Sequence, residues 1–303
     1  MISIRQLIYF NALARELHFG RAAEICCVSQ PALSMQISEL EQTLNVQLVV
    51  RHSRSITLTG EGKEIARRAK RILTSIDDLA DFARHGTKLL TGPLKLGVIP
   101  TIAPYLLPRI LPLLKQNFPQ LNISLRESQT ENLLQLLIEN RLDVALLALP
   151  VDSRELEQVP LFEDPFLLAI PNDHPLKSKK PVRVEDLKDS RLLLLEEGHC
   201  LRDQAASVCH LAGVDSFDEF GASSLATILQ MVTNGYGITL LPDLCRRVET
   251  SNLPGITVTS LKDPAPSRTI GLAWRRTSSR KVDYIELGRT IIEAREDATP
   301  EIT

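Results

Sequence analysis

The sequence predicts an α+β multidomain protein, in which a small helical region precedes a larger α/β region. The chain has 303 residues, and at roughly 100 to 200 residues per domain this length leaves room for two or three domains. Residues 3–45 place apolar side chains at helical spacing in three short segments. Beyond residue 92, short apolar runs typical of strands alternate with helical patterns, which favours an α/β class there.

The composition excludes several other classes of protein. Hydrophobic residues make up 44% of the chain and charged residues 24%, as in ordinary folded domains. No apolar run approaches the roughly 18 residues of a membrane span, and charged residues interrupt the first thirty positions. We therefore expect a cytoplasmic protein with no membrane partner. Five cysteines form no disulfide framework, and an odd count points to free thiols.

The near-neutral net charge of -2 conceals an asymmetry along the chain. Residues 1–90 carry 12 lysines and arginines against 9 acidic residues, whereas the remainder carries 23 against 28. Much of the positive charge lies within residues 51–71, which suits a polyanion such as DNA. A solvated helix face would show a similar run of charge.

The first three predicted helices have the arrangement of a helix-turn-helix. Pro31 suits the first turn of the third helix, and only a short turn separates that helix from the second. The face of the third helix opposite its apolar stripe can approach base edges in a major groove. That face carries small or amide-bearing side chains and one methionine: Gln30, Ser34, Ser38 and Met35.

Two consecutive stretches follow this pattern closely: SQPALSMQISELEQTLN at 29–45 and VVRHSRSITLTGEG at 49–62. They resemble the recognition helix and wing of the LysR-type transcriptional regulators. The resemblance implies a winged helix-turn-helix over residues 1–58 that binds double-stranded DNA. Its DNA contacts would come from Gln30, Pro31, Ser34 and Ser38 on the helix and from Arg51 and Arg54 on the wing. Met35 departs from the residue types common in the family.

A long helix is predicted from Thr59, which is a plausible N-cap. One face of it repeats at alternating spacings of four and three, as in a two-stranded coiled coil. A helix packed on its own domain would show a similar stripe over this length. We assign 59–91 to a linker and dimerisation helix with its hinge, and expect a homodimer on inverted-repeat DNA. The seam residues are Ile65, Ala69, Ile72, Ile76, Leu79 and Ala83.

Residues 92–303 are predicted to form an α/β regulatory domain. Apolar runs such as 144–149 suit strands that are buried on both faces. The family resemblance implies a periplasmic-binding-protein-like domain of two Rossmann-like lobes, about 92–163 with 269–303 and about 164–268. Candidate strands are 94–99, 121–127, 143–149, 165–171, 191–197, 237–242 and 268–275. Candidate helices lie near 103–117, 130–140, 201–212, 223–234 and 281–296.

Two threonines stand at strand-to-helix turns of this domain, where open α/β sheets bind their ligands. They are Thr101 and Thr130. Both side chains have a simpler alternative role, which is to cap the helices that follow them.

The stretch EEGHCLRDQAASVCH at 196–210 carries the chemistry that we single out. Cys200 opens a predicted helix close to Arg202, and a thiol at a helix N-terminus near cations has a lowered pKa. Cys209 lies nine residues on, about 13 Å along a helix axis, whereas a disulfide needs a Cα separation of roughly 4.4 to 6.8 Å. A bridge would therefore unwind the segment, as in a redox switch. The alternatives are two buried structural thiols, or a metal site with His199 and His210, whose spacing matches no usual ligand knuckle.

Four further stretches resemble the hydrogen-peroxide-sensing members of the LysR-type regulators. They are VIPTIAPYLLPRILP at 98–112, EEGHCLRDQAASVC at 196–209, GYGITLLPD at 235–243 and SRTIGLAWR at 267–275. The resemblance implies that Cys200 is the peroxidatic cysteine and Cys209 the resolving one, joined in a reversible disulfide. It further implies that Arg268 stabilises the thiolate and that four residues bind or orient peroxide: Thr101, Thr130, Gly198 and His199. Gly221 and residues 206–208 depart from the pattern of some relatives.

The same resemblance sets the expected partners and excludes a cofactor. We expect hydrogen peroxide as the signal, RNA polymerase as a partner, thioredoxin or glutaredoxin as reductant, and dimers that pair into tetramers. No cofactor and no metal are expected, and Cys26, Cys27 and Cys245 are expected to be structural. Two other functions remain open: a LysR-type regulator that answers a small effector in the inter-lobe cleft, and a thiol peroxidase, against which the helix-turn-helix argues.

The predicted seam can be tested by placing a charge in it. Ile72→Glu should convert the dimer into monomers in analytical ultracentrifugation, because a carboxylate at a core position of a coiled coil is desolvated without a partner. An unaltered dimer would rule out the seam as the dimer contact.

Overall fold

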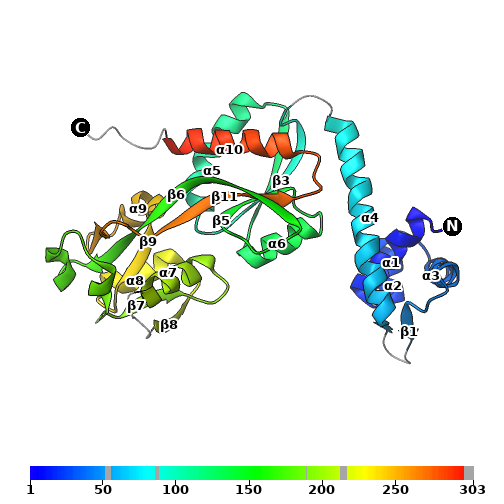
Figure 1. The fold of residues 1–303 in the computed structure, drawn as a ribbon, viewed down its shortest axis with the longest axis horizontal. Helices are drawn as coiled ribbons and strands as arrows, with labels where there is room; N and C mark the ends of the chain where they lie inside the picture. The colour runs from blue at the N-terminus through cyan, green and yellow to red at the C-terminus, as the bar shows by residue number, and fades with distance from the viewer. Residues whose placement is uncertain (52–55, 86–88, 189, 212–216, 297–303) are drawn as a thin grey trace. The chain divides into compact units, whose positions relative to one another are not determined.

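A computed structural model describes residues 1–51, 56–85, 89–188, 190–211 and 217–296 (Figure 1). Side chains at 77, 78, 80–85, 209, 211, 217–221 and 296 lie outside that description. The chain divides into two compact units, Met1–Gly86 and Thr87–Thr303. Within the described residues, no helix is long and apolar enough to cross a membrane.

The first unit contains the three predicted short helices, a two-stranded antiparallel wing and a long helix. The recognition-type helix α3 begins where the sequence predicts, because the Ser29 hydroxyl accepts from the Ala32 N–H at 3.4 Å and Pro31 lies in the first turn. Its inner face carries Leu33, Ile37 and Leu40, all fully buried. The elements are α1 Ile4–Glu16, α2 Phe19–Ile25, α3 Gln30–Leu44, β1 Val49–Arg51, β2 Ile56–Leu58 and α4 Gly60–His85.

The burial of the predicted seam residues changes along the long helix α4. The predicted cap is confirmed, because Thr59 Oγ1 accepts from the Gly62 N–H at 2.8 Å. Ala69 is buried within a single chain. This agrees with the alternative to a coiled coil, in which the helix packs on its own domain. Farther along, Ile72 is 49% exposed and Leu79 is 68% exposed. Two residues of the predicted seam, Ile72 and Leu79, are therefore exposed in a single chain.

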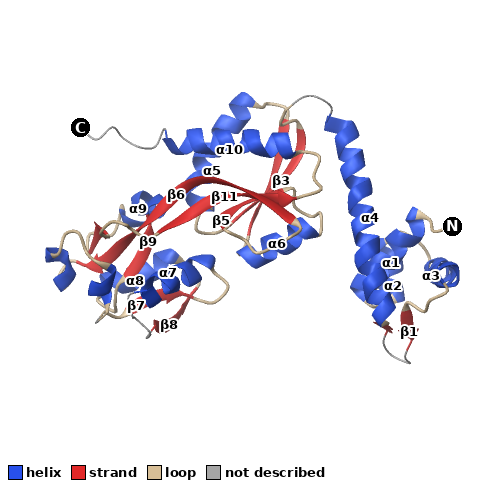
Figure 2. Ribbon diagram, viewed as in Figure 1, coloured by secondary structure: helices blue, strands red, loops and turns tan. Residues whose placement is uncertain are grey.

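The second unit is α/β, as predicted, and contains two hydrophobic cores (Figure 2). The first core lies around a sheet of order β6–β11–β5–β3–β4, in which β3 runs parallel to β4 and β5 while β11 runs antiparallel to β5 and β6. Helices α5 and α10 lie together on one face, and α6 covers the other (Figure 1). We call this part lobe I. Its elements are β3 Gly92–Val98, α5 Ala103–Asn117, β4 Leu121–Glu127, α6 Thr130–Ile138, β5 Val144–Leu149, β11 Ser267–Arg275 and α10 Lys281–Glu296.

Strand β6, Leu156–Pro171, belongs to both lobes. Its residues up to Pro165 pair with β11, and from Phe166 onward it pairs with β9 and β10. The second core, which we call lobe II, surrounds that second half of β6. The other elements of lobe II are β7 Leu192–Leu195, α7 Cys200–Leu211, β8 Phe217–Ala222, α8 Leu225–Thr233, β9 Thr239–Pro242, α9 Asp243–Thr250 and β10 Ile256–Ser260, with 3-10 turns at Pro175–Ser178 and Val184–Leu187.

The strand predicted at 165–171 is only the second half of β6. The first half contains Pro160, which ordinarily argues against a strand interior. Here the register shifts by one residue between Ile270 and Gly271 of β11, opposite Phe162 and Pro160. The bulge accommodates the proline because it breaks the ladder of hydrogen bonds at that point. Strands β8 and β10 were also absent from the predicted set.

A buried ion pair fastens α10 to the start of β3. Asp283 accepts from Arg280 Nε at 2.8 Å and from the Leu90 N–H at 3.2 Å, and Arg280 donates to the Pro93 carbonyl at 2.6 Å. Both ion-pair side chains are at most 10% exposed. Removal of one partner from such a pair leaves the other as an uncompensated buried charge.

Asp283→Ala should therefore destabilise the second unit by about 3 to 5 kcal/mol. Urea unfolding followed by the fluorescence of the single tryptophan, Trp274, measures this change. The matched control on the same helix is Glu286→Ala, whose exposed ion pair with Arg289 should contribute about 1 kcal/mol or less. Equal effects of the two variants would contradict a stabilising role for the buried ion pair of Asp283 and Arg280.

Candidate functional site

Helix α7 carries Cys200 at its first position, directly after strand β7 and a four-residue loop. Three side chains of α7 lie one helical turn apart in the core of lobe II: Leu201, Ala205 and Val208. The half-buried side chain of Cys200 instead packs against the core of lobe I. One helix is thus fastened to both lobes, and Cys200 makes the contact with lobe I.

Cys209 lies on the same continuous helix as Cys200. Nine helical residues separate the two Cα positions by about 13 Å, so the helix keeps the cysteines apart. The side chain of Cys209 lies outside the described residues. The structure thus confirms the helical spacing and contains no bridge between described cysteines.

Gly198, in the loop before α7, meets lobe I through Gln129. Its backbone has φ +89°, a conformation that favours glycine. A Cβ atom at this position would come within 2.9 Å of the Gln129 side chain. The loop therefore approaches the start of α6 so closely that only a glycine fits without displacing Gln129. No local sequence pattern marks this contact.

His199, the last residue of this loop, is buried. It is 7% exposed, and its Nε2 lies 3.8 Å from a carboxylate oxygen of Glu196. Its carbonyl accepts from the Arg202 N–H, while Arg202 Nη1 reaches the Leu195 carbonyl at 3.4 Å. These contacts fix the geometry of the first turn of α7.

Thr101 and Thr130 do not cap the helices that follow them. The alternative prediction, that both are simply N-caps, is therefore wrong. Ile102 holds the N-cap position of α5 and Gln129 that of α6, without a side-chain capping bond in either case. Thr130 is the first residue of α6, and its buried hydroxyl has no hydrogen-bond partner among the described residues. A second buried polar atom without a hydrogen-bond partner among the described residues is Oε1 of Gln204, one helical turn after Cys200. Buried polar atoms of this kind are ordinarily satisfied by protein, water or ligand.

Thr101 belongs to a buried polar cluster with Arg268 and Asp164. Arg268 Nη1 donates to the Thr101 hydroxyl at 2.8 Å, and Nη2 donates to the Thr101 carbonyl at 3.1 Å. Arg268 also forms an ion pair with Asp164, and both residues are 2% exposed. The described hydrogen bonds and ion pairs of Arg268 go to these two residues, and none goes to Cys200.

The same cluster extends to α9 through a buried thiol. Cys245 is fully buried, as expected for a packed thiol, and its Sγ lies 3.6 Å from the Thr101 carbonyl. Burial raises the pKa of this thiol to about 12, an effect that the charge of Arg268 opposes. The neighbouring Tyr105 hydroxyl of α5 donates to Glu249 of α9 at 2.7 Å, which joins the two lobes by a side-chain bond.

The described candidates for DNA contact lie on α3 and on the wing of the first unit. Gln30 and Pro31 are exposed, and Ser34 and Ser38 are half-buried on the same helix. Arg51 on the wing donates to the Ser34 hydroxyl at 3.2 Å and lies over the Phe19 ring. Arg54 lies outside the described residues. The structure therefore places the wing beside the exposed face of α3.

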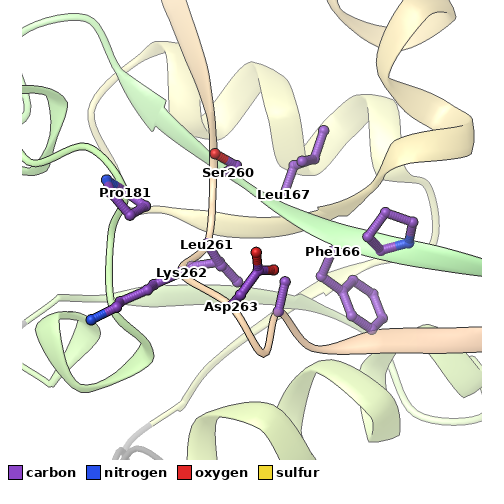
Figure 3. Close-up of a pocket in the computed structure, with 9 residues that line it drawn as sticks. Phe166, Leu167, Pro181, Ser260, Leu261, Lys262 and Asp263 are labelled. Carbon is purple, nitrogen blue, oxygen red and sulfur yellow. The ribbon is translucent and has the colours of Figure 1, made fainter.

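No group of three His, Cys, Asp or Glu side chains able to hold a metal exists among the side chains that the structure describes. A cavity of about 500 Å³ lies in lobe II, between β6 and the segment after β10 (Figure 3). Its lining includes Phe166, Pro181, Lys262 and Asp263 and contains no residue that the sequence singled out. The predicted site is thus separate from this cavity.

A helix-turn-helix with a wing, followed by a two-lobed α/β unit, defines a LysR-type transcriptional regulator rather than an enzyme. The chain belongs to the LysR family: residues 4–63 match the bacterial regulatory helix-turn-helix protein model of that family, and residues 87–283 match the LysR substrate binding domain. Within the family, it is similar over nearly its whole length to OxyR of Escherichia coli K12, a DNA-binding transcriptional dual regulator. The two are 44% identical over 290 residues, which cover 96% of this chain and 95% of that protein.

Solved structures of OxyR proteins resemble this chain across both units. A full-length OxyR variant from Pseudomonas aeruginosa is 36% identical, with a TM-score of 0.75 over 96% of this chain and 95% of that one. A mutant of Corynebacterium glutamicum OxyR, solved with hydrogen peroxide bound, is 34% identical, with a TM-score of 0.69 over 98% and 93%. The oxidized form of the latter protein is also 34% identical, with a TM-score of 0.62 over the same shares.

Gly198→Ala should cost more stability than the same change at Gly235, because both glycines have positive φ but only Gly198 has a neighbour within 4 Å of the added Cβ. An alanine in left-handed backbone costs about 1 to 2 kcal/mol by itself. Urea unfolding of both variants isolates the contact with Gln129. In the double variant Gly198→Ala with Gln129→Ala, the extra loss of stability relative to Gly235→Ala should disappear. If the losses of the two single variants simply add, the contact is contradicted.

Proposed function

We propose that this chain is a hydrogen-peroxide-responsive transcriptional regulator of antioxidant genes, switched by a reversible disulfide between Cys200 and Cys209. The observation that carries the proposal is the position of Cys200. It opens α7 and packs against lobe I, while the rest of α7 packs in lobe II. A change at this sulfur therefore acts on the contact between the lobes. The similarity to OxyR proteins, one of them solved with peroxide bound, supports peroxide as the signal.

The chemistry proceeds in two balanced steps. The Cys200 thiolate attacks one peroxide oxygen, the O–O bond breaks, and the departing hydroxide takes a proton to become water, which leaves a sulfenic acid. The Cys209 thiol then attacks the sulfenic sulfur, forms the S–S bond and releases a second water. Thr101, Thr130, Gly198 and His199 surround or orient the peroxide, and Arg268 supplies positive charge toward the thiolate. The orphaned hydroxyl of Thr130 supports a ligand in this region.

The second step requires α7 to unwind, because helical spacing holds the two Cα positions about 13 Å apart. Unwinding withdraws Leu201 and Val208 from the lobe II core, which costs roughly 3 to 6 kcal/mol for two such side chains. For a two-electron couple this cost raises the reduction potential of the disulfide by roughly 60 to 130 mV. A disulfide that is easier to reduce suits a reversible switch restored by thioredoxin or glutaredoxin.

The output of the switch is carried by the first unit. Gln30, Pro31, Ser34 and Ser38, with Arg51 and Arg54 of the wing, contact double-stranded DNA at inverted-repeat promoter sites. The exposed side chains of Ile72 and Leu79 support dimerisation along α4. In our proposal, dimers assemble into tetramers, and oxidation changes their arrangement on DNA and their engagement of RNA polymerase.

Addition of one equivalent of hydrogen peroxide to the reduced protein should consume two thiols and yield a Cys200–Cys209 bridge by mass spectrometry. The DNase footprint on an inverted-repeat promoter should change at the same time. Cys200→Ser should abolish both effects, whereas Cys27→Ser, which removes an exposed thiol of the first unit, should preserve both. A normal footprint change in Cys200→Ser would refute the proposal, whereas a metabolite that shifts DNA binding equally well in Cys200→Ser would favour the small-effector alternative.

A further inference from the structure

Asp164 is a buried carboxylate to which the proposed chemistry gives no role. It lies directly opposite Arg268 on the neighbouring strands β6 and β11, and it is 2% exposed. Its Oδ2 accepts a hydrogen bond from Nε of Arg268 at 2.9 Å and lies 2.9 Å from Nη2 in the ion pair. Its Oδ1 accepts from the Leu244 N–H at 2.9 Å, in the first turn of α9. One carboxylate thus fixes both the plane of the guanidinium and the start of a helix.

The fixed guanidinium in turn decides how Thr101 can form hydrogen bonds. Arg268 Nη1 donates to the Thr101 hydroxyl at 2.8 Å. A hydroxyl has one proton to donate, and a guanidinium has no acceptor. Thr101 therefore accepts from Arg268 and keeps its own proton for another partner. The carbonyl of Thr101 is held as well, by Nη2 of Arg268.

We propose that Asp164 is a positioning residue for the peroxide reaction, which acts through Arg268 to make Thr101 a hydrogen-bond donor toward the departing peroxide oxygen. The inference rests on the proposed function, in which Thr101 meets the peroxide. As the O–O bond breaks, negative charge develops on the departing oxygen, and a donor already fixed in place stabilises it. Removal of one such donor typically slows a reaction about 100-fold to 1,000-fold.

The test compares two reactions of Cys200 in the full-length reduced protein, followed on the Cys200 peptide by mass spectrometry. Hydrogen peroxide needs the donor, whereas iodoacetamide is attacked at carbon and releases iodide without it. In Asp164→Asn, the Oδ1 acceptor for Leu244 remains, but an amide N–H group faces the N–H groups of Arg268. The peroxide rate constant should fall about 10-fold to 100-fold, and the iodoacetamide rate constant should be unchanged.

Two controls bracket this result. Glu163→Gln alters the adjacent carboxylate, which binds Ser267 and Thr269 at the surface, and should leave both rates unchanged. Asp164→Glu keeps a carboxylate and should react with peroxide faster than Asp164→Asn.

A second pair of variants tests the donor without altering the ion pair, because Thr101→Val removes the hydroxyl and Thr101→Ser retains it. Adding Asp164→Asn to Thr101→Val should cause no further loss in the peroxide rate.

Equal falls in both rates would overturn the inference, because they would reveal a structural role alone. An unchanged peroxide rate in Asp164→Asn would overturn it as well, as would an additive loss in the double variant. If wild-type Cys200 reacts with iodoacetamide but not with peroxide, the proposed function fails, and this inference fails with it.

Discussion

The buried ion pair of Arg268 and Asp164 stands where β6 passes from one lobe to the other, and the geometry of the site depends on it. The pair holds Thr101 of lobe I and the first turn of α9 in lobe II. Both charges are almost completely removed from water, so the loss of either partner would leave the other uncompensated at a cost of about 3 to 5 kcal/mol. Together with the bond between Tyr105 and Glu249, it makes the junction of the lobes resist movement.

Against this fixed junction, α7 is the element that oxidation would change. Its apolar face is held in lobe II by three buried side chains, while Cys200 alone of its described side chains is assigned to the core of lobe I. A void of about 10 Å³ lies beneath it, lined by Leu201 and Ala205 among others. Its helical state therefore rests on a few kcal/mol of packing, which the formation of a covalent bond can exceed. Within the continuous helix, nine residues keep the two Cα positions about 13 Å apart.

Local patterns were enough to predict the helix-turn-helix, the cap at Thr59, the helix that begins at Cys200 and the buried strand β5. Tertiary contacts were not accessible in this way. Asp164 and Arg268 are 104 residues apart in the chain, and Gln129 and Gln204 carry no local pattern that marks them as part of a site. The caps proposed for Thr101 and Thr130 were wrong because the N-cap position of α5 falls on Ile102 and that of α6 on Gln129. The first half of β6 escaped prediction because the bulge that accommodates Pro160 depends on β11.

Hydrogen–deuterium exchange of the full-length protein before and after one equivalent of peroxide tests the central claim most directly. The account predicts that the amides of residues 200–211 exchange slowly in the reduced protein and become rapidly exchanging once mass spectrometry shows the Cys200–Cys209 bridge. Strands β3, β5 and β11 should keep their protection, because the core of lobe I and its junction with lobe II stay in place. Unchanged protection of residues 200–211 in bridged protein would contradict the account.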